Sequence, residues 1–169
     1  MNLCAGVFAA IWLGITIPQY TDTLNIEEVI TLPVKDEMEY TISEEEFELL
    51  CRCVESEAGD QGYLGKCFVV DVILNRVENK EFPNDIISVI KQKGQFDVVA
   101  NGRIYTVPVT EETRQAVRDE LKHRTNREML FFCMYRWFDG WADYMFTYPQ
   151  NRPHNCHHFY KAKNKRGVK

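Results

Sequence analysis

Apolar residues recur at helical spacing in the segment that follows residue 43. The repeating positions are Phe47, Leu50, Cys51, Val54 and Ala58. Steps of three and four place them on one face of an α-helix. Ser43 with Glu46 fits a capping box, which opens a helix at about residue 44, and Gly59 is a common residue at a helix end. The pattern predicts a helix that carries Glu57 in its last turn.

The next segment, "YLGKCFVVDVILNRVEN", is apolar around most of its circumference when it is drawn as a helix. Such a helix lies in the middle of a domain, covered on all sides. Asp71 and Asn75 are four residues apart and therefore share one face of it. Because buried polar groups need partners, this pair is either a structural network or part of a site.

Shorter patterns complete the chain. "FPNDIISVIKQ" predicts a third helix with Asn84 as its cap, and Thr110 caps a fourth, amphipathic helix, "EETRQAVRDELKHR". Turn dipeptides mark the stretch between them as a loop. "REMLFFCMYRWF" and "CHHFYKA" are typical of strands or extended segments. Helices followed by a small extended region indicate an α+β fold, mainly helical with a small antiparallel sheet.

The N-terminal stretch from Leu3 to Ile17 is uninterruptedly uncharged and mostly apolar. It suits the apolar region of a signal peptide better than a full membrane span, although no Lys or Arg precedes it and no clean cleavage site follows. A buried core helix is the alternative. We expect residues 1–18 to be an export or anchor segment, 19–40 an acidic linker with one short strand at 27–34, and 41–169 the folded domain that carries the function.

Composition narrows the class of function. The 169 residues carry 20 Lys and Arg against 25 Asp and Glu, a net charge of −5, whereas nucleic-acid binders are normally basic. The six cysteines include no CxxC pair, so a zinc ribbon is not predicted. Spacing leaves a Cys133–Cys156 bridge open.

A cluster of potential ligands near the C-terminus comprises His154, Cys156, His157 and His158. Its spacing matches no standard zinc pattern, because neighbours in an extended segment point to opposite sides. We therefore expect no metal and no other cofactor.

Glu57 is the strongest candidate for chemistry. A carboxylate at a helix C-terminus is disfavoured by the partial negative charge there, and Glu55 adds a like charge nearby in sequence. Both effects, and burial, would raise the pKa of Glu57, so that its carboxyl group stays protonated near neutral pH. Cleavage of a glycosidic bond requires such a general acid. The alternative from spacing alone is a carboxylate that caps the helix or lies in solvent.

Residues 49–103 resemble the SleB/CwlJ family of spore-cortex and cell-wall hydrolases in four linked blocks. The matching positions are Glu57-Ala58, Gly65 onward to Leu74-Asn75-Arg76-Val77, Phe82-Pro83 with Ile86, Val89 and Ile90, and Gly94-Gln95-Phe96. The family commonly has an aromatic residue where this chain has Glu55. Further on the likeness is thinner, but "MLFF" at 129–132 and His157-His158-Phe159-Tyr160 fit the closing strand pair and H-x-F segment of the family, with His157 in the H position.

The resemblance implies a lysozyme-like α+β domain that cleaves peptidoglycan between N-acetylmuramic acid and N-acetylglucosamine. It places the catalytic glutamate on Glu57, as acid and then base of a lytic transglycosylase, so no second carboxylate is needed. The residues that we expect to contact substrate are Gln95, Phe96, Asn75, Asp71, His157 and Tyr160. For Gln95 and Phe96 the alternative is a loop anchor, and for Asp71 it is an anchor of its neighbours in the helix.

Four aromatic residues lie in the weakest part of the match. Trp137, Trp141, Tyr144 and Tyr148 either stack on sugar faces or cover the core. We expect a monomer that acts on glycan strands in the cell envelope or spore cortex, with membrane association through residues 3–17. The rival hypotheses are a catalytically silent wall-binding or partner-binding module and a metal-dependent amidase.

Overall fold

The computed structural model describes residues 40–135, 142–149 and 155–163. The expected export segment, the strand at 27–34 and residues 19–39 of the expected linker lie outside these residues, as do Trp137, Trp141 and His154. Within the described part of the chain, none of the helices has both the length and the apolar character needed to cross a bilayer.

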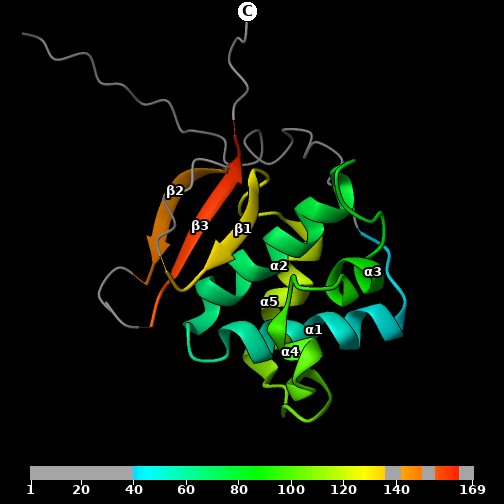
Figure 1. Ribbon diagram of the computed structural model, residues 1–169. Coiled ribbons are helices and arrows are strands. Elements are labelled where there is room, and N and C mark those ends of the chain that lie inside the picture. Colours follow the sequence, from blue (N-terminus) through cyan, green and yellow to red (C-terminus); the bar gives the residue numbers. More distant parts are fainter. Residues whose placement is uncertain (1–39, 136–141, 150–154, 164–169) are drawn as a thin grey trace, which may run out of the picture. The chain divides into compact units, whose positions relative to one another are not determined.

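Helices form the first part of the domain and strands the second (Figure 1). The elements are α1 (Glu44–Ala58), α2 (Gly62–Glu78), α3 (Ile86–Lys91), α4 (Asp97–Ala100), the 3₁₀ turn η2 (Arg103–Tyr105), α5 (Glu111–Lys122), β1 (Met129–Cys133), β2 (Ala142–Tyr148) and β3 (His157–Ala162). The predicted α+β class, with a mainly helical core and a small antiparallel sheet, is confirmed.

The ends of α1 show which local signals were sound. Ser43 accepts a hydrogen bond from the backbone N–H of Glu46 at 3.2 Å, and the Glu46 carboxylate accepts one from the Ser43 N–H at 2.9 Å. The predicted capping box is therefore present. Gly59 follows the helix with right-handed backbone angles, whereas Gly62 has the positive φ of 73° that favours glycine. The left-handed turn thus comes at the start of α2.

Two other helix starts were predicted with mixed success. Thr110 caps α5 by accepting from the Thr113 N–H at 3.3 Å, as expected. Asp85, and not Asn84, caps α3, because its carboxylate accepts from the Ser88 N–H at 2.7 Å. The prediction was one residue early, since both types suit the position and only the backbone angles distinguish them.

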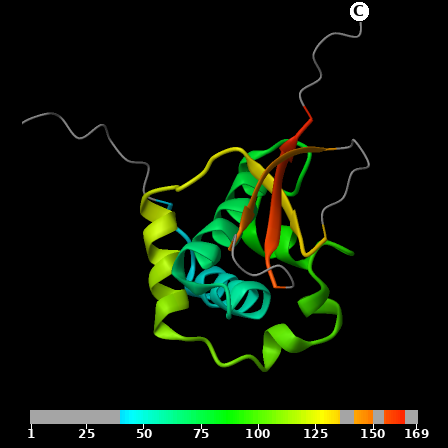
Figure 2. The same ribbon diagram turned by 90° about the vertical axis from the view of Figure 1, so that its left-hand side faces the viewer.

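The predicted central position of α2 is confirmed. Most of its length is buried, and it lies between α1 and the sheet in Figure 1. Val69, Val70 and Ile73 belong to the main core with side chains from α1, α3 and α5, whereas Phe68 and Val72 pack against strand residues. Figure 2 shows α5 and the sheet on different sides of α2. Helix α2 therefore packs against both the other helices and the sheet.

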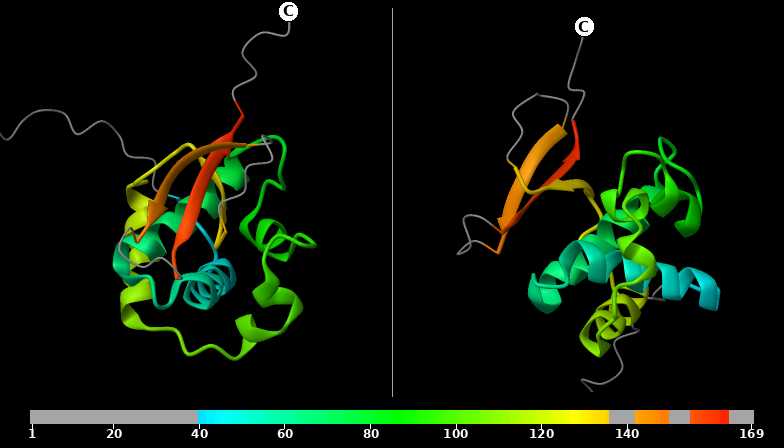
Figure 3. Two further views of the ribbon diagram at one scale, coloured as in Figure 1. Left: turned by 60° about the vertical axis from the view of Figure 1, so that its left-hand side comes forward. Right: turned by 60° about the horizontal axis from the view of Figure 1, so that its bottom comes forward.

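The sheet has the strand order β1-β3-β2, with both pairs antiparallel. Figure 3 shows it standing to one side of the helices. Phe159 on the central strand packs against Phe68 of α2, with ring centroids 5.3 Å apart, and against Phe146 of β2 at 5.1 Å. Strand β2 was not predicted. Cys133 and Cys156 are both free thiols, so the bridge that spacing left open is not formed.

Candidate active site

Glu57 lies in the last turn of α1 between two buried neighbours. Ser56 and Ala58 are at most 5% exposed, whereas Glu57 itself is partly exposed. Val54, one turn earlier, belongs to the main core. The helix thus holds the carboxyl group at the edge of the core, where its oxygen atoms can still meet a ligand.

The electrostatics of this position suit a general acid. Burial raises the pKa of Glu57 from 4.5 to about 7, the negative charge of Asp97 acts in the same direction, and the positive charge of Arg103 opposes both. Near neutral pH a large share of the Glu57 carboxyl groups therefore carries a proton. A carboxylic acid that stays protonated at this pH can donate to a leaving oxygen.

The like charge that acts on Glu57 is Asp97, and the expectation that it would be Glu55 is wrong. Glu55 is 7% exposed and accepts hydrogen bonds from the Thr110 N–H at 2.9 Å, the Thr110 hydroxyl at 2.7 Å and the Thr113 hydroxyl at 2.5 Å. Burial alone would raise the pKa of Glu55, but these bonds and the charge of Lys66 lower it. Glu55 therefore secures the start of α5 against α1.

Asp97 reaches the end of α1 because its two neighbours are buried there. Phe96 is 4% and Val98 5% exposed, and both belong to the same core cluster as Val54 and Ala58. Asp97, the first residue of α4, is exposed between them. Two anchored neighbours therefore fix the backbone position of this carboxylate next to the end of α1.

Gln95 and Phe96 of the G-Q-F block were expected either to contact substrate or to anchor the loop, and the structure separates them. Gln95 is exposed and can reach a ligand. Phe96 is buried, with its ring 6.3 Å from that of Phe132 and 5.3 Å from the Arg76 guanidinium carbon. Phe96 is consequently a loop anchor, and the expectation that it contacts sugar does not fit its burial.

Arg76 is a second anchor of the same region. It is 4% exposed, its Nε donates to the Leu130 carbonyl at 2.8 Å, and its guanidinium carbon lies 5.2 Å from the Phe82 ring centre and 5.7 Å from that of Phe131. Such contacts between a cation and ring faces are attractive. Arg76 thus joins α2 to the segment before α3, to the G-Q-F loop and to β1.

Asp71 and Asn75 form a structural network. Asp71 is fully buried; its carboxylate pairs with Arg124 at 2.9 Å and accepts from the Asn126 N–H at 2.6 Å. Asn75 is 4% exposed and donates to the carbonyls of Asn126 at 2.9 Å and Met129 at 2.8 Å. Asp71 has no surface left for substrate, so the substrate-binding interpretation is wrong for it. The pair therefore fixes the backbone of Asn126 and Met129, where the chain enters β1.

His157 and Tyr160 cannot share one ligand, because they project from opposite faces of β3. The His157 ring lies 4.8 Å from the Phe132 ring, and burial lowers the pKa of His157 to about 4, so it is neutral. Tyr160 is 2% exposed and packs against Tyr144, with ring centroids 5.7 Å apart. Tyr148 packs edge-on against Phe68. For Tyr148 the core interpretation is therefore the right one.

Sequence reasoning did not identify Asp97 or Arg103. Asp97 directly follows the G-Q-F block, which was the available signal, but only the packing of α4 and η2 on α1 reveals their effect on Glu57. Among the residues that the structure describes, no group of three or more His, Cys, Asp or Glu side chains is arranged to hold a metal ion.

Comparison with known proteins assigns the chain to a family. A family model described as cell wall hydrolase matches residues 60–160, which is more than half of the chain. The chain belongs to the cell wall hydrolase family. The match begins shortly after Glu57, so the role of that residue rests on its geometry and on the sequence resemblance.

Two curated relatives illustrate the likeness. The spore cortex-lytic enzyme of Halalkalibacterium halodurans is 35% identical over 100 residues, which are 59% of this chain and 28% of that protein. The enzyme of the same name from Bacillus cereus is 38% identical over 79 residues, covering 47% of this chain and 30% of the relative. The chain thus spans less than a third of the length of these relatives.

Solved structures of the family extend the likeness to nearly a whole domain. The catalytic domain of the germination-specific lytic transglycosylase SleB from Bacillus anthracis superposes with a TM-score of 0.59 at 27% identity, over 71% of this chain and 97% of that one. The catalytic domain of the SleB protein from Bacillus cereus gives 0.58 at 28% identity, over 75% and 98%. The resemblance noted in the sequence is confirmed.

Proposed function

We propose that this member of the cell wall hydrolase family is a lytic transglycosylase that cuts peptidoglycan glycan strands between N-acetylmuramic acid and N-acetylglucosamine, with Glu57 as the acid and then the base. The observation that carries the proposal is the pKa of Glu57, raised to about 7 at the edge of the core. Relatives named spore cortex-lytic enzyme and lytic transglycosylase support it.

The reaction needs one carboxyl group in two protonation states. Protonated Glu57 gives its proton to the glycosidic oxygen, the bond from that oxygen to the anomeric carbon breaks, and an oxocarbenium-like centre develops. The resulting Glu57 carboxylate takes the proton of the muramoyl 6-hydroxyl while that oxygen bonds to the anomeric carbon. The proton is thus returned, and no water is consumed. Asp97 assists because its negative charge favours the protonated form of Glu57 before each turnover.

The proposal extends to the surroundings of the site. Exposed Gln95 is placed to hydrogen-bond a sugar beside Glu57, and a contact of His157 with substrate stays a prediction. We place the protein as a monomer in the cell wall or spore cortex. Export or membrane tethering by residues 1–18 is part of the same proposal.

Replacing Glu57 by Gln tests the assignment. We expect the loss of a general acid to reduce the rate of glycan cleavage about 10²- to 10⁴-fold. Purified peptidoglycan is digested, and the products are identified by mass spectrometry, with anhydromuramic ends as the expected signature. Glu45→Gln, an exposed change at the start of the same helix, is the matched control and should retain full activity.

Three outcomes would contradict the proposal. A folded Glu57→Gln protein with full activity would remove Glu57 from the mechanism. Binding to the wall without any cleavage by the native protein would favour the silent binding module. Release of peptides from intact glycan strands would identify an amidase.

A further inference from the structure

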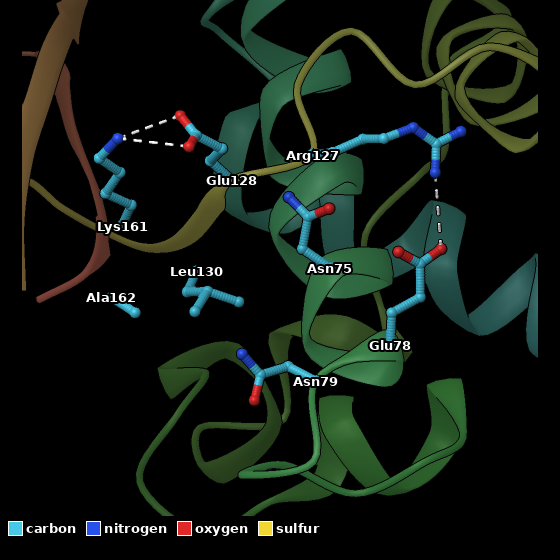
Figure 4. A pocket seen from close by; sticks show the side chains of 8 residues that line it. All are labelled: Asn75, Glu78, Asn79, Arg127, Glu128, Leu130, Lys161 and Ala162. Carbon is cyan, nitrogen blue, oxygen red and sulfur yellow. Dashed lines mark hydrogen bonds and ion pairs between the residues drawn. The ribbon is translucent and has the colours of Figure 1, made fainter. Parts of the chain in front are cut away.

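A polar pocket lies at the end of α2 that is remote from Glu57. It has a volume of about 370 Å³ and opens between the end of α2, the residues just before β1, and the end of β3 (Figure 4). Its polar side chains are Asn75, Glu78, Asn79, Arg127, Glu128 and Lys161. Glu57 precedes the other end of α2, a helix of 17 residues that is about 25 Å long. The pocket is therefore separate from the candidate active site.

An ion pair lies on each of two sides of the pocket. Lys161 lies 3.2 Å from Glu128, and Arg127 lies 3.9 Å from Glu78. Figure 4 shows these pairs apart from each other, with the amide of Asn75 between them. Ion pairs as exposed as these stabilise a protein little. A ligand that offers its own carboxylate and ammonium can thus replace their contacts at low cost.

Arg127 is the cation most available to a ligand. The Glu78 oxygen atom nearest to it already accepts from the Tyr40 hydroxyl at 2.7 Å and from Arg124 at 3.2 Å. Arg127 approaches that oxygen only to 3.9 Å, and its side chain is 58% exposed. A guanidinium in this position can form two parallel hydrogen bonds with an incoming carboxylate.

The pocket also offers a partner for a peptide group. The Asn79 Oδ1 accepts from the Glu81 N–H at 2.9 Å, which fixes the amide and directs its NH₂ group toward the hollow (Figure 4). An amide NH₂ donates to a peptide carbonyl. Among the residues that the structure describes, none that lines the pocket is aromatic, so they offer no ring on which a sugar could stack.

We propose that this pocket binds the peptide stem of peptidoglycan, with a stem carboxylate on Arg127 and the ammonium group of its diamino acid on Glu128. The inference rests on the proposed function, because the stem belongs to the strand that Glu57 would cut. Contact at both ends of α2 would hold a stem-bearing strand along the domain. Binding energy gained at the pocket would then lower KM for strands that carry stems.

Direct binding is the first test. The whole chain with Glu57→Gln, which should turn over glycan at least about 10²-fold more slowly, is titrated by calorimetry with the free tripeptide L-Ala-D-Glu-diaminopimelate. We expect saturable binding that Arg127→Gln weakens about tenfold or more, because a hydrogen-bonded charge pair is lost. Arg118→Gln, a change of a partly exposed arginine on α5 that does not line the pocket, should bind like the parent. Absence of saturable binding, or equal affinity of the two arginine variants, would overturn the proposal.

A kinetic test separates this proposal from the proposed function. With Glu57 intact, Arg127→Gln should raise KM for stem-bearing strands and leave cleavage of strands stripped of their stems unchanged. An equal effect on both substrates would refute stem recognition while leaving glycan cleavage established. An active Glu57→Gln protein would instead refute the catalytic assignment without affecting the calorimetric result.

Discussion

Asp97→Asn should move the pH profile of the enzyme and leave its fold unchanged. Asp97 is exposed, and its amide analogue keeps the size of the side chain but loses the charge. Burial is the larger cause of the raised pKa of Glu57, Asp97 is the next, and Arg103 acts in the opposite direction. The substitution therefore removes the smaller of two contributions and lowers the pKa of Glu57 only part of the way toward 4.5.

The expected decrease in the pKa of Glu57 in Asp97→Asn follows from simple electrostatics. Two charges about 4 Å apart interact by about 1 kcal/mol when water screens them fully; because Asp97 is exposed, this is the magnitude that applies, and a pKa difference of one corresponds to about 1.4 kcal/mol. Because the acid must be protonated, activity falls as the pH rises through its pKa, which is about 7 in the native protein. We expect the alkaline limb of kcat/KM to move down by about 0.5 to 1 pH unit.

The assay is the pH dependence of kcat/KM on one defined glycan substrate, since this parameter reports the pKa of the free enzyme. Arg103→Gln provides a control of opposite sign, because it removes the positive charge and should move the limb upward. Glu55→Gln should leave the limb where it is. An unchanged limb in Asp97→Asn, or movement of both charge variants in one direction, would refute the electrostatic account of Glu57.

Three further outcomes follow from the described contacts. Glu55→Gln should lower the free energy of unfolding, measured in urea, by about 2 kcal/mol. Because the pKa of Glu55 is lowered in the folded protein, the stability that its carboxylate contributes is complete above a pH of about 4.5 and is lost as the pH falls through the lowered pKa. A destabilisation that stays the same in strong acid would contradict this. Asp71→Ala removes the buried carboxylate paired with Arg124 and leaves Glu78, at 3.2 Å and partly exposed, as its remaining ion-pair partner among the described residues; the change should cost about 3 kcal/mol, whereas a loss below about 1 kcal/mol would exclude the structural role. Peptidoglycan clearing should survive EDTA, and an activity lost to the chelator and restored by zinc would favour the metal-dependent amidase.

The local features of the site were readable in the sequence, and the tertiary ones were not. The capping box and the helical period placed Glu57 in the last turn of α1, because both depend only on neighbours in the chain. The partner that tunes its acidity, Asp97, is 40 positions away in the printed numbering. The sequence suggested Glu55 instead, since nothing in a helical wheel reveals that its carboxylate is occupied by the start of α5.

Strand β2 escaped prediction for a different reason. Its side chains are nearly all partly buried, so apolar and polar positions do not alternate as they do on a strand with one wet face. The pairing with β3 also shifts register between Tyr144 and Phe146, which interrupts the period of two. Strand β1 was found because "MLFFC" is a short apolar run, and β3 because "HHFYKA" has two adjacent aromatic residues at its centre.

The cation–ring cluster around Arg76 has a consequence for sequence change in this domain. Phe82, Phe96 and Phe131 come from separate segments, yet each lies within 5.7 Å of the same guanidinium carbon. Substitutions at these positions share a partner, so their energetic effects are not additive. Epistasis among four sites is the outcome: the part of each ring's contribution that depends on the guanidinium should disappear when Arg76 is replaced by an uncharged residue, whereas the packing of Phe96 in the core should remain.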